Sequence, residues 1–476
     1  MTLPSPLPRI IQGGMGVAVS NWRLANAVAR AGQLGVVSGS MLDTVFVRRL
    51  QDGDPGGHMR RAIAAFPIPD AGGEILRRYY NPKGRDAGVP YKNLPMYKQQ
   101  VSDARQRVTI VANFVEVWLA KEGHSGPVGL NLLTKVQMPN LASLYGAMLA
   151  GIDVVIMGAG IPREIPGVLD AFAEHRPAQL KFDVDGLARG DAEYLSFDPA
   201  SFAPPTIREQ PLRRPAFIAV VSASSLAITL ARKSNGRVDG FVVERPVAGG
   251  HNAPPRGELQ LNDRGEPIYG DRDIVDLEKM REIGVPFWIA GGAGSPCGVA
   301  TALANGAAGV QVGTLFAYCE ESGLSPELRA RVLAAVADGT ATLRTDPRAS
   351  PTGYPFKVVE LPGDAERSAA RVRVCDLGYL RVPVRTDTGR TVYRCSAEPV
   401  DAYVAKGGSV ADTEGRRCLC NGLTATIGQA QWRVATHDWE IPLVTSGDDL
   451  LSLTDFAADN QHYSAADVVR YLSLRG

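Results

Sequence analysis

The feature that most constrains the fold is a series of short, continuous apolar runs, separated by segments with helical periodicity. Continuous rather than alternating apolar residues are typical of strands buried on both faces, as in a parallel sheet. Eight repetitions of strand and helix favour a (β/α)8 TIM barrel over an open, doubly wound α/β sheet. The predicted strands are Arg9–Gly14, Leu34–Ser38, Val128–Leu132, Asp153–Met157, Phe217–Val221, Gly240–Glu244, Phe287–Ala290 and Val310–Val312.

A ninth run complicates this count. Either Gln179–Val184 or the Phe217 run could form the fifth strand, and we favour the Phe217 run, which leaves Lys181 on an inserted strand or loop. Residues 51–126, after the second strand, form an insertion far longer than a usual βα loop. Two interpretations stay open: a lid over the active face, or a surface excursion with aromatic packing. The aromatic residues concerned are Tyr79, Tyr80, Tyr91 and Tyr97.

The C-terminal region does not continue the repeat. We therefore predict a barrel over residues 1–345 and a C-terminal extension of mixed α/β structure over residues 346–476. Within the extension, Val372–Val384 and Arg390–Cys395 are predicted as short strands, and Ser464–Leu474 as a terminal helix.

Composition excludes several classes of protein. Lys and Arg number 51 against 50 Asp and Glu, so no global basic field exists to hold nucleic acid or an anionic membrane. The longest uncharged run, Ile283–Cys319, contains two prolines and eight glycines, which favours buried strands and turns over a membrane span. Met1–Arg9 lacks the apolar core of a signal peptide, and six cysteines are too few for a secreted disulfide scaffold. We expect a cytoplasmic protein.

Glycine-rich turns follow the last two predicted strands. One contains Gly291, Gly292 and Gly294, and the other contains Gly313 and Thr314 after Gln311. In barrels, the loops after strands seven and eight often bind phosphate. Glycine lets backbone N–H groups approach an anion closely, and a helix N-terminus adds partial positive charge. These turns therefore predict the phosphate site of a cofactor.

The first strand also ends in glycine, with Gly13, Gly14 and Met15. Barrel closure places strand one beside strand eight, so a flat ring system attached to that phosphate could lie against this backbone. Asn131 at the third strand could bond ring heteroatoms, and Lys181 could place a positive charge near an electron-rich ring. A structural role is an equally good interpretation of either side chain alone.

A histidine follows the sixth strand. The chain leads from Glu244 to Gly249, Gly250 and His251, which directs the imidazole toward the mouth of the barrel with little crowding. Imidazole is the side chain best suited to proton transfer near neutral pH. The other five histidines have no comparable setting. We therefore predict that His251 is catalytic.

Five motifs in order, QGGMG at 12–16, GLN at 129–131, AGGH at 248–251, AGG at 290–292 and GVQVGT at 309–314, together resemble the nitronate monooxygenase family, formerly called 2-nitropropane dioxygenases. The related FMN-dependent enoyl-thioester reductases share much of the pattern. The resemblance covers Pro8–Gly339 and implies a TIM barrel that binds FMN without a covalent link, with His251 catalytic. The family lysine expected after strand five is absent, since Ser222 stands there, and Lys181 is the predicted substitute. The cofactor-binding residues predicted in this way are Gly13, Gly14, Met15, Asn131, Lys181, Ser222, Glu244, Gly249, Gly250, Gly291, Gly292, Gly294, Gln311, Gly313 and Thr314.

The resemblance implies an FMN-dependent oxidoreductase that oxidises nitronates or nitroalkanes with O2. A second hypothesis is an NAD(P)H-dependent reductase of enoyl thioesters or quinones on the same flavin. A third is a flavin-binding module without catalysis. The expected partners are a small-molecule substrate and O2, with neither nucleic acid nor membrane, and a homodimer is the assembly considered.

Four cysteines lie in the extension, at Cys375, Cys395, Cys418 and Cys420. Four thiols could bind Zn²⁺ or an iron–sulfur cluster if they converge. Only Cys418 and Cys420 are close in sequence, and their spacing is shorter than the usual two-residue gap. Free, buried thiols and no metal are therefore the default expectation.

Overall fold

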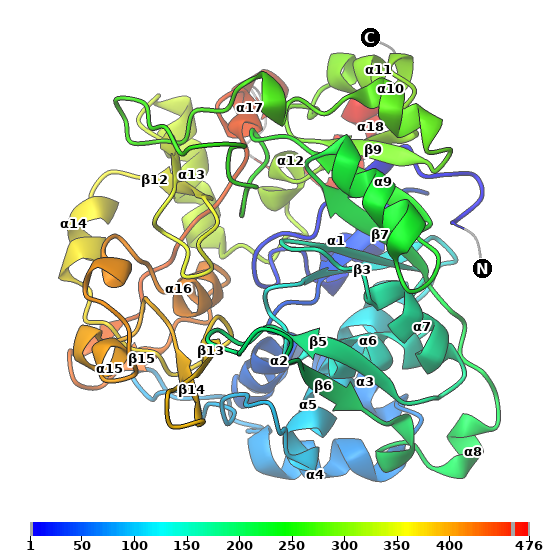
Figure 1. Cartoon of the computed structure of the whole chain (residues 1–476), viewed down its shortest axis with the longest axis vertical. Helices are drawn as coiled ribbons and strands as arrows, with labels where there is room; N and C mark the ends of the chain where they lie inside the picture. The colour runs from blue at the N-terminus through cyan, green and yellow to red at the C-terminus, as the bar shows by residue number, and fades with distance from the viewer. Residues whose placement is uncertain (1–2, 458–461, 475–476) are drawn as a thin grey trace.

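The computed structural model describes residues 3–457 and 462–474 and contains an eight-stranded parallel sheet in the order β1-β10-β9-β8-β7-β4-β3-β2. An isolated parallel bridge between Ile11 and Leu34 joins the two outermost strands. At this seam the Gln12 N–H donates to the Leu34 carbonyl at 3.0 Å. The sheet therefore closes on itself, and the predicted (β/α)8 barrel is confirmed (Figure 1).

All eight predicted runs form the barrel strands. The ninth run forms β5 (Ala178–Phe182), which pairs antiparallel with β6 (Glu193–Phe197) outside the barrel. The Phe217 run is thus the fifth barrel strand, as predicted. The barrel strands are β1 (Ile10–Gln12), β2 (Gly35–Ser38), β3 (Val128–Leu133), β4 (Val154–Gly158), β7 (Ala216–Val221), β8 (Gly240–Glu244), β9 (Phe287–Ala290) and β10 (Gly309–Val312).

Both faces of these strands are buried, which explains their continuous apolar character. One face contributes a compact interior cluster that includes Ile11, Ile156, Ile218 and Trp288. Trp288 is fully buried, and its indole N–H donates to the carbonyl of Pro8 at 2.8 Å. Each such side chain stabilises the fold by about 1.5–3 kcal/mol through burial. The interior is therefore a packed core, and any cavity must lie at an end of the barrel.

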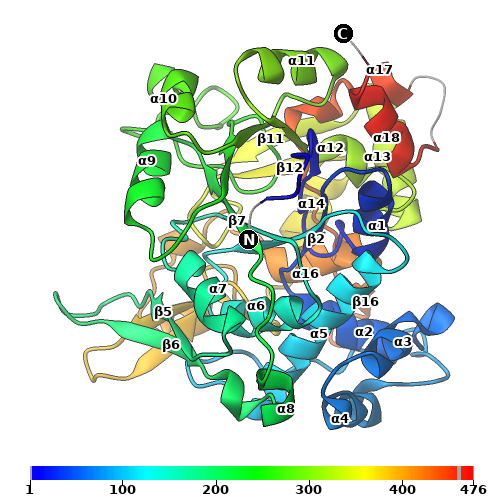
Figure 2. The same cartoon turned by 90° about the vertical axis from the view of Figure 1, so that its right-hand side faces the viewer.

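Helices cover the outer faces of the strands (Figure 2). The first, α1 (Trp22–Arg30), begins at Asn21, whose side chain accepts hydrogen bonds from the N–H groups of Arg23 and Leu24. The other helices that follow barrel strands are α2 (Leu42–Gln51), α6 (Asn140–Leu149), α7 (Ile165–Ala173), α9 (Ser224–Lys233), α10 (Leu277–Glu282), α11 (Pro296–Ala304), α12 (Thr314–Ala317) and α13 (Pro326–Ala337).

The insertion at 51–126 is helical, with α3 (His58–Ala64), α4 (Pro69–Tyr79) and α5 (Asp103–Lys121). The long helix α5 packs against α1, α2 and α6 and so belongs to the layer around the barrel. Three of the four tyrosines singled out above are buried, and the Tyr97 hydroxyl donates to Asp43 at 3.2 Å. The tyrosines therefore pack into the body of the protein, which matches the second of the two interpretations.

The extension begins with a hairpin of β11 (Thr342–Asp346) and β12 (Phe356–Glu360), so the proposed boundary at 345 falls within β11. Only the end of the predicted Val372–Val384 strand is extended, as β13 (Val382–Arg385), which pairs with β14 (Thr391–Arg394). The predicted terminal helix is confirmed as α18. The remaining elements are α14 (Asp364–Ala370), α15 (Val400–Val404), α16 (Leu419–Thr426), β15 (Trp432–Arg433), β16 (Asp438–Trp439), α17 (Leu453–Ala457) and α18 (Ala465–Leu472).

The extension lies across one side of the barrel in Figure 1. Its β13–β14 hairpin docks against the β5–β6 hairpin: the Asp185 N–H donates to Pro383 at 3.0 Å, and the Arg385 N–H donates to Asp185 at 2.8 Å. An ion pair between Arg385 and Glu193 joins the same two hairpins. Among the described helices, none has the length and apolar character to span a bilayer.

Candidate active site

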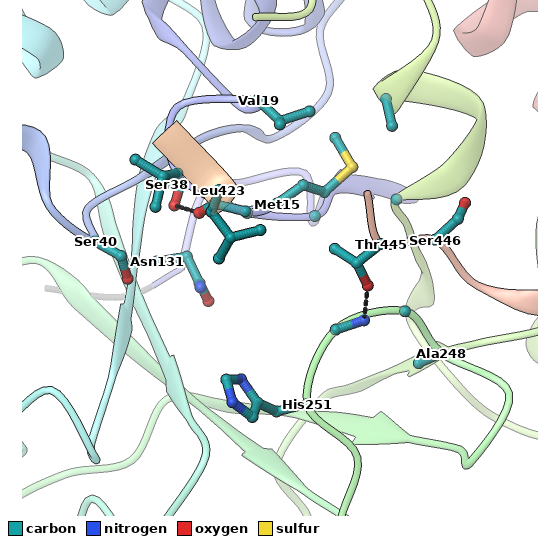
Figure 3. Close-up of a pocket in the computed structure, with 18 of the residues that line it drawn as sticks. Met15, Val19, Ser38, Ser40, Asn131, Ala248, His251, Leu423, Thr445 and Ser446 are labelled. Atoms are coloured by element: carbon teal, nitrogen blue, oxygen red, sulfur yellow. Dashed lines mark hydrogen bonds between the residues drawn. The ribbon is translucent and has the colours of Figure 1, made fainter. Parts of the chain in front are cut away.

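A cavity of about 230 Å³ lies at the carboxyl ends of the barrel strands, where barrel enzymes place their chemistry. The side chains of Met15, Asn131 and His251 point into it from different strand ends (Figure 3). Most of the residues predicted from the sequence line this cavity. They are Gly13, Gly14, Met15, Asn131, Glu244, Gly249, Gly250, His251, Gly291, Gln311, Gly313 and Thr314.

The turn after β1 forms a flat wall made of backbone. A Cβ atom on Gly14 would come within 2.8 Å of Asn131 Cγ and closer still to Asn131 Cβ, so the turn packs on β3 only because residue 14 is glycine. On the neighbouring strand, Gln311 Oε1 is buried and has no hydrogen-bond partner among the described residues. A flat wall with an unpartnered amide oxygen fits a flat heteroaromatic ring with N–H groups, such as a flavin.

The C-terminal extension supplies the opposite wall, which the sequence analysis missed. Residues 443–449 run along the glycine turns. The Gly250 N–H donates to Thr445 Oγ1 at 2.9 Å, and the Gly447 N–H donates to Thr314 Oγ1 at 3.0 Å. Apolar side chains of Leu380 and Leu423 line the same wall. No motif or periodicity marks these segments, so only long-range contacts identify them.

Lys181 does not line the cavity. It is exposed on β5, and because β5 leaves the barrel for an outer hairpin, its side chain cannot replace the missing family lysine. Its backbone N–H donates to Glu164 at 2.8 Å. No Lys or Arg lines the cavity within the part of the chain that the structure describes. Any phosphate bound there would rely on N–H and O–H donors.

Three other predicted residues also lie outside the cavity lining. Ser222 borders a separate, smaller pocket, which it shares with Glu244. Gly292 is exposed, beside Val247. The N–H of Gly294 already donates to the Asp449 carboxylate, whose pKa burial raises. At Gly294, the turn after β9 therefore already donates its N–H to a carboxylate of the chain itself.

The donors that remain for a phosphate cluster around the turn after β10. Gly313 and Thr314 line the cavity, and Ser446 Oγ lies 3.4 Å from Thr314 Oγ1. Thr445 contributes a further hydroxyl. A Cβ on Gly313 would approach Met15 Sδ at 3.4 Å, so the turns of β1 and β10 are in contact. The phosphate donors and the ring wall are therefore adjacent, as a flavin mononucleotide requires.

His251 connects the barrel to the extension. Its Nε2 lies 2.7 Å from Ser350 Oγ, and its ring packs edge-on against Phe356 with centroids 4.8 Å apart. Burial lowers the pKa of His251 to about 4 and raises the pKa of Glu244 to about 8. Both side chains line the cavity, and these shifts favour the uncharged form of each near pH 7.

A (β/α)8 barrel with glycine turns and a histidine at its carboxyl end has the arrangement of many barrel enzymes. Residues 178–350, which run from β5 to the Ser350 beside His251, match the family model described as nitronate monooxygenase. This match agrees with the resemblance seen in the sequence over these residues and supports an oxidoreductase.

A search of curated proteins finds no match. The chain is similar to solved structures at low identity. FabK from Thermotoga maritima is 17% identical over 98% of this chain and 91% of that chain, with a TM-score of 0.45. Nitroalkane oxidase from Streptomyces ansochromogenes is 16% identical over 98% and 95%, with a TM-score of 0.45. The enoyl reductase domain of MlnA from Bacillus amyloliquefaciens is 13% identical over 98% and 92%, with a TM-score of 0.47.

Proposed function

We propose that the protein is an FMN-dependent oxidoreductase that oxidises nitronates or nitroalkanes with O2. The observation that carries the proposal is the position of His251. It lies within the segment that matches the nitronate monooxygenase family, and it shares one cavity with Asn131 and the glycine wall after β1.

The described residues suggest how FMN would be held. Gly13, Gly14 and Met15 would contact the ring system, and the Gln311 amide would accept a ring N–H. Thr314 and Ser446 would bind the phosphate through hydroxyl and backbone donors. When bound, a flavin supplies the redox chemistry by accepting electrons from the substrate and passing them to O2.

The hydrogen bonds around His251 are compatible with a tautomer that leaves Nδ1 unprotonated. The Thr352 N–H donates to Ser350 Oγ at 3.2 Å, and Ser350 Oγ lies 2.8 Å from Thr352 Oγ1. If Ser350 donates to Thr352, it accepts from the Nε2–H of His251, and Nδ1 keeps its lone pair. Nδ1 has no hydrogen-bond partner among the described residues. It is thus the ring nitrogen available to take the α-proton of a nitroalkane.

The low pKa of His251 makes this base weak, because its burial penalises the imidazolium that proton transfer creates. A preformed nitronate needs no proton removed. The protonated carboxyl of Glu244 and the amide of Asn131 offer neutral hydrogen-bond donors in the same cavity. We therefore expect nitronates to be better substrates than the corresponding nitroalkanes.

The apolar extension wall favours a second candidate. Leu380, Leu423 and Leu443 line the cavity, and such an apolar surface suits an acyl chain. The alternative is NAD(P)H-dependent reduction of an enoyl thioester or a quinone, in which His251 would donate a proton or anchor the substrate.

An anaerobic visible spectrum separates the candidates. Flavin-loaded protein is mixed first with a propyl nitronate and, in a separate cell, with NADH. Loss of flavin absorbance or a semiquinone with nitronate alone supports the proposal, and bleaching by NADH alone supports the reductase. A flavoprotein that turns over with neither supports the non-catalytic module. Failure to bind FMN overturns both enzymatic candidates.

A further inference from the structure

The hydroxyl of Tyr318 is buried beside the main cavity and has no hydrogen-bond partner among the described residues. Its side chain directly follows α12, and the residue is only 1% exposed. A buried hydroxyl without a partner destabilises a protein, and native structures rarely keep one without a reason. Because Tyr318 lines a cavity, its free hydroxyl indicates a donor kept for a ligand.

Tyr318 lies beside two hydroxyls that were assigned above to a phosphate. It is four residues after Thr314, across α12, so the two side chains share one face of this helical turn. Burial raises the pKa of the Tyr318 hydroxyl to about 12, and the nearby Ser446 hydroxyl counteracts part of this shift. Tyr318 and Ser446 are therefore neighbours, although they do not form a hydrogen bond of ordinary geometry. Ser446 Oγ in turn lies 3.4 Å from Thr314 Oγ1.

Two threonine hydroxyls of the cavity lining also have protons left to donate. Thr314 Oγ1 accepts the Gly447 N–H at 3.0 Å, and Thr445 Oγ1 accepts the Gly250 N–H at 2.9 Å, which Figure 3 shows at the edge of the cavity. Neither threonine hydroxyl donates to another described residue. The backbone thus fills the acceptor side of both hydroxyls and leaves their protons available to an anion.

The charges around the cavity make such donors necessary. No Lys or Arg is among its described lining residues, and Asp449 adds a carboxylate beside Gly294. An anion that is buried without an opposite charge is stabilised only by a dense set of hydrogen bonds. A phenol is more acidic than an aliphatic alcohol, and it therefore donates a stronger hydrogen bond to a phosphate. Tyr318 is suited to contribute what a lysine or arginine contributes elsewhere.

We propose that Tyr318 is a cofactor-binding residue whose hydroxyl donates to the phosphate of FMN, together with Thr314 and Ser446. The inference rests on the FMN binding of the proposed function, and it names the donor that would select FMN over riboflavin. Riboflavin has the same ring system and side chain but lacks the phosphate, so it would leave Tyr318 without a partner. The motifs that carry the family resemblance end at Thr314, and they do not include Tyr318.

The test is a flavin titration of the full-length protein after removal of any bound flavin. Fluorescence quenching gives the affinities for FMN and for riboflavin, and wild-type protein should bind FMN more tightly by about tenfold or more. Tyr318→Phe should lower the affinity for FMN by about tenfold or more, because a hydrogen bond to a charged group is lost. Its affinity for riboflavin should equal that of the wild type.

Thermal unfolding of the flavin-free protein gives a second measurement. Tyr318→Phe should be at least as stable as the wild type, because the substitution removes a buried hydroxyl that has no partner. Tyr145→Phe is the matched control, because the Tyr145 hydroxyl lies 2.8 Å from His175 Nδ1 and Tyr145 does not line the cavity. The control should unfold at a lower temperature and should keep the wild-type ratio of the two flavin affinities.

Equal affinities of the wild type for FMN and riboflavin would overturn the proposal, and so would an unchanged ratio of the two affinities in Tyr318→Phe. In both cases FMN still binds, so the proposed function is unaffected. Parallel losses of both affinities in Tyr318→Phe would give Tyr318 a purely structural role, which also overturns the proposal. A wild-type protein that binds neither flavin would overturn the proposed function as well, so the two failures are distinguished.

Discussion

The two walls of the main cavity have opposite characters. The barrel wall is made of strand ends and glycine turns and holds the polar groups, with Asn131 and His251 among them. The extension wall contributes apolar side chains far away in sequence, such as Leu380 and Leu423, and two hydroxyls, at Thr445 and Ser446. Ser350 of the extension also bonds His251. In the proposed function, the barrel would supply the chemistry, and the extension would orient His251, help to hold the phosphate and cover the site.

The largest expected effect lies on the barrel wall. His251→Asn should lower turnover with a neutral nitroalkane by about 10²-fold or more, because the general base that takes its α-proton is lost. FMN binding should be unchanged, because the predicted ring and phosphate contacts lie on other turns. Stopped-flow and steady-state kinetics measure the turnover, and fluorescence titration measures the affinity for FMN. An unaltered kcat would show that His251 is not catalytic.

Gly14→Ala tests whether the barrel wall must be bare backbone. The added Cβ would lie within 2.8 Å of Asn131 Cγ, and such overpacking costs about 1–3 kcal/mol. We expect the affinity for FMN to fall by about tenfold. Gly270→Ala is the control, because a new Cβ there would meet no atom within 4 Å and Gly270 does not line the cavity. Equal losses in both variants would contradict a specific role for position 14.

Ser350→Ala asks whether the extension orients the barrel histidine. Loss of one hydrogen bond, worth about 0.5–1.5 kcal/mol, should lower kcat by about 2- to 10-fold. In a double variant with His251→Asn, Ser350→Ala should cause no additional loss of kcat. Independent, multiplying losses would mean that Ser350 acts on something other than His251.

Glu244→Gln should have the smallest effect, visible as a change in the pH dependence of stability. The pKa of about 8 means that the native state keeps a proton that the unfolded chain has released above pH 4.5. Wild-type stability should therefore fall as pH rises toward 8, and the variant should lack this fall. Melting temperatures measured between pH 6.5 and 8 separate the effect of Glu244 from that of His251. The effect of His251 on stability has the opposite sign and is confined to about pH 4 to 6.5.

The barrel wall was largely predictable, because a strand buried on both faces needs apolar residues at consecutive positions and so appears in the sequence as a continuous apolar run. Parallel strands bring their carboxyl ends to one rim, so the order of the runs was enough to group Asn131, His251 and Thr314. Lys181 shows the limit of this logic. Its run has strand propensity but pairs with β6 in an outer hairpin, and local sequence does not show whether a strand enters the barrel.

The extension wall was not predictable for a related reason. Residues 443–447 form no helix or strand, and their place depends on single hydrogen bonds to Gly250 and Thr314. Likewise, sequence spacing alone does not show that Cys375, Cys395, Cys418 and Cys420 line one small cavity. Contacts between irregular segments leave no periodic trace in a sequence.

The position of residues 443–449 also concerns the order in which the protein is made. A ribosome completes the last barrel strand at Val312 long before it reaches the segment that lies over the glycine turns. Domains generally fold from the N-terminal side during synthesis. The carboxyl end of the barrel is therefore uncovered until residues 443–449 have been made. Loading of a cofactor is easiest in that interval, and completion of the chain then closes the site over it.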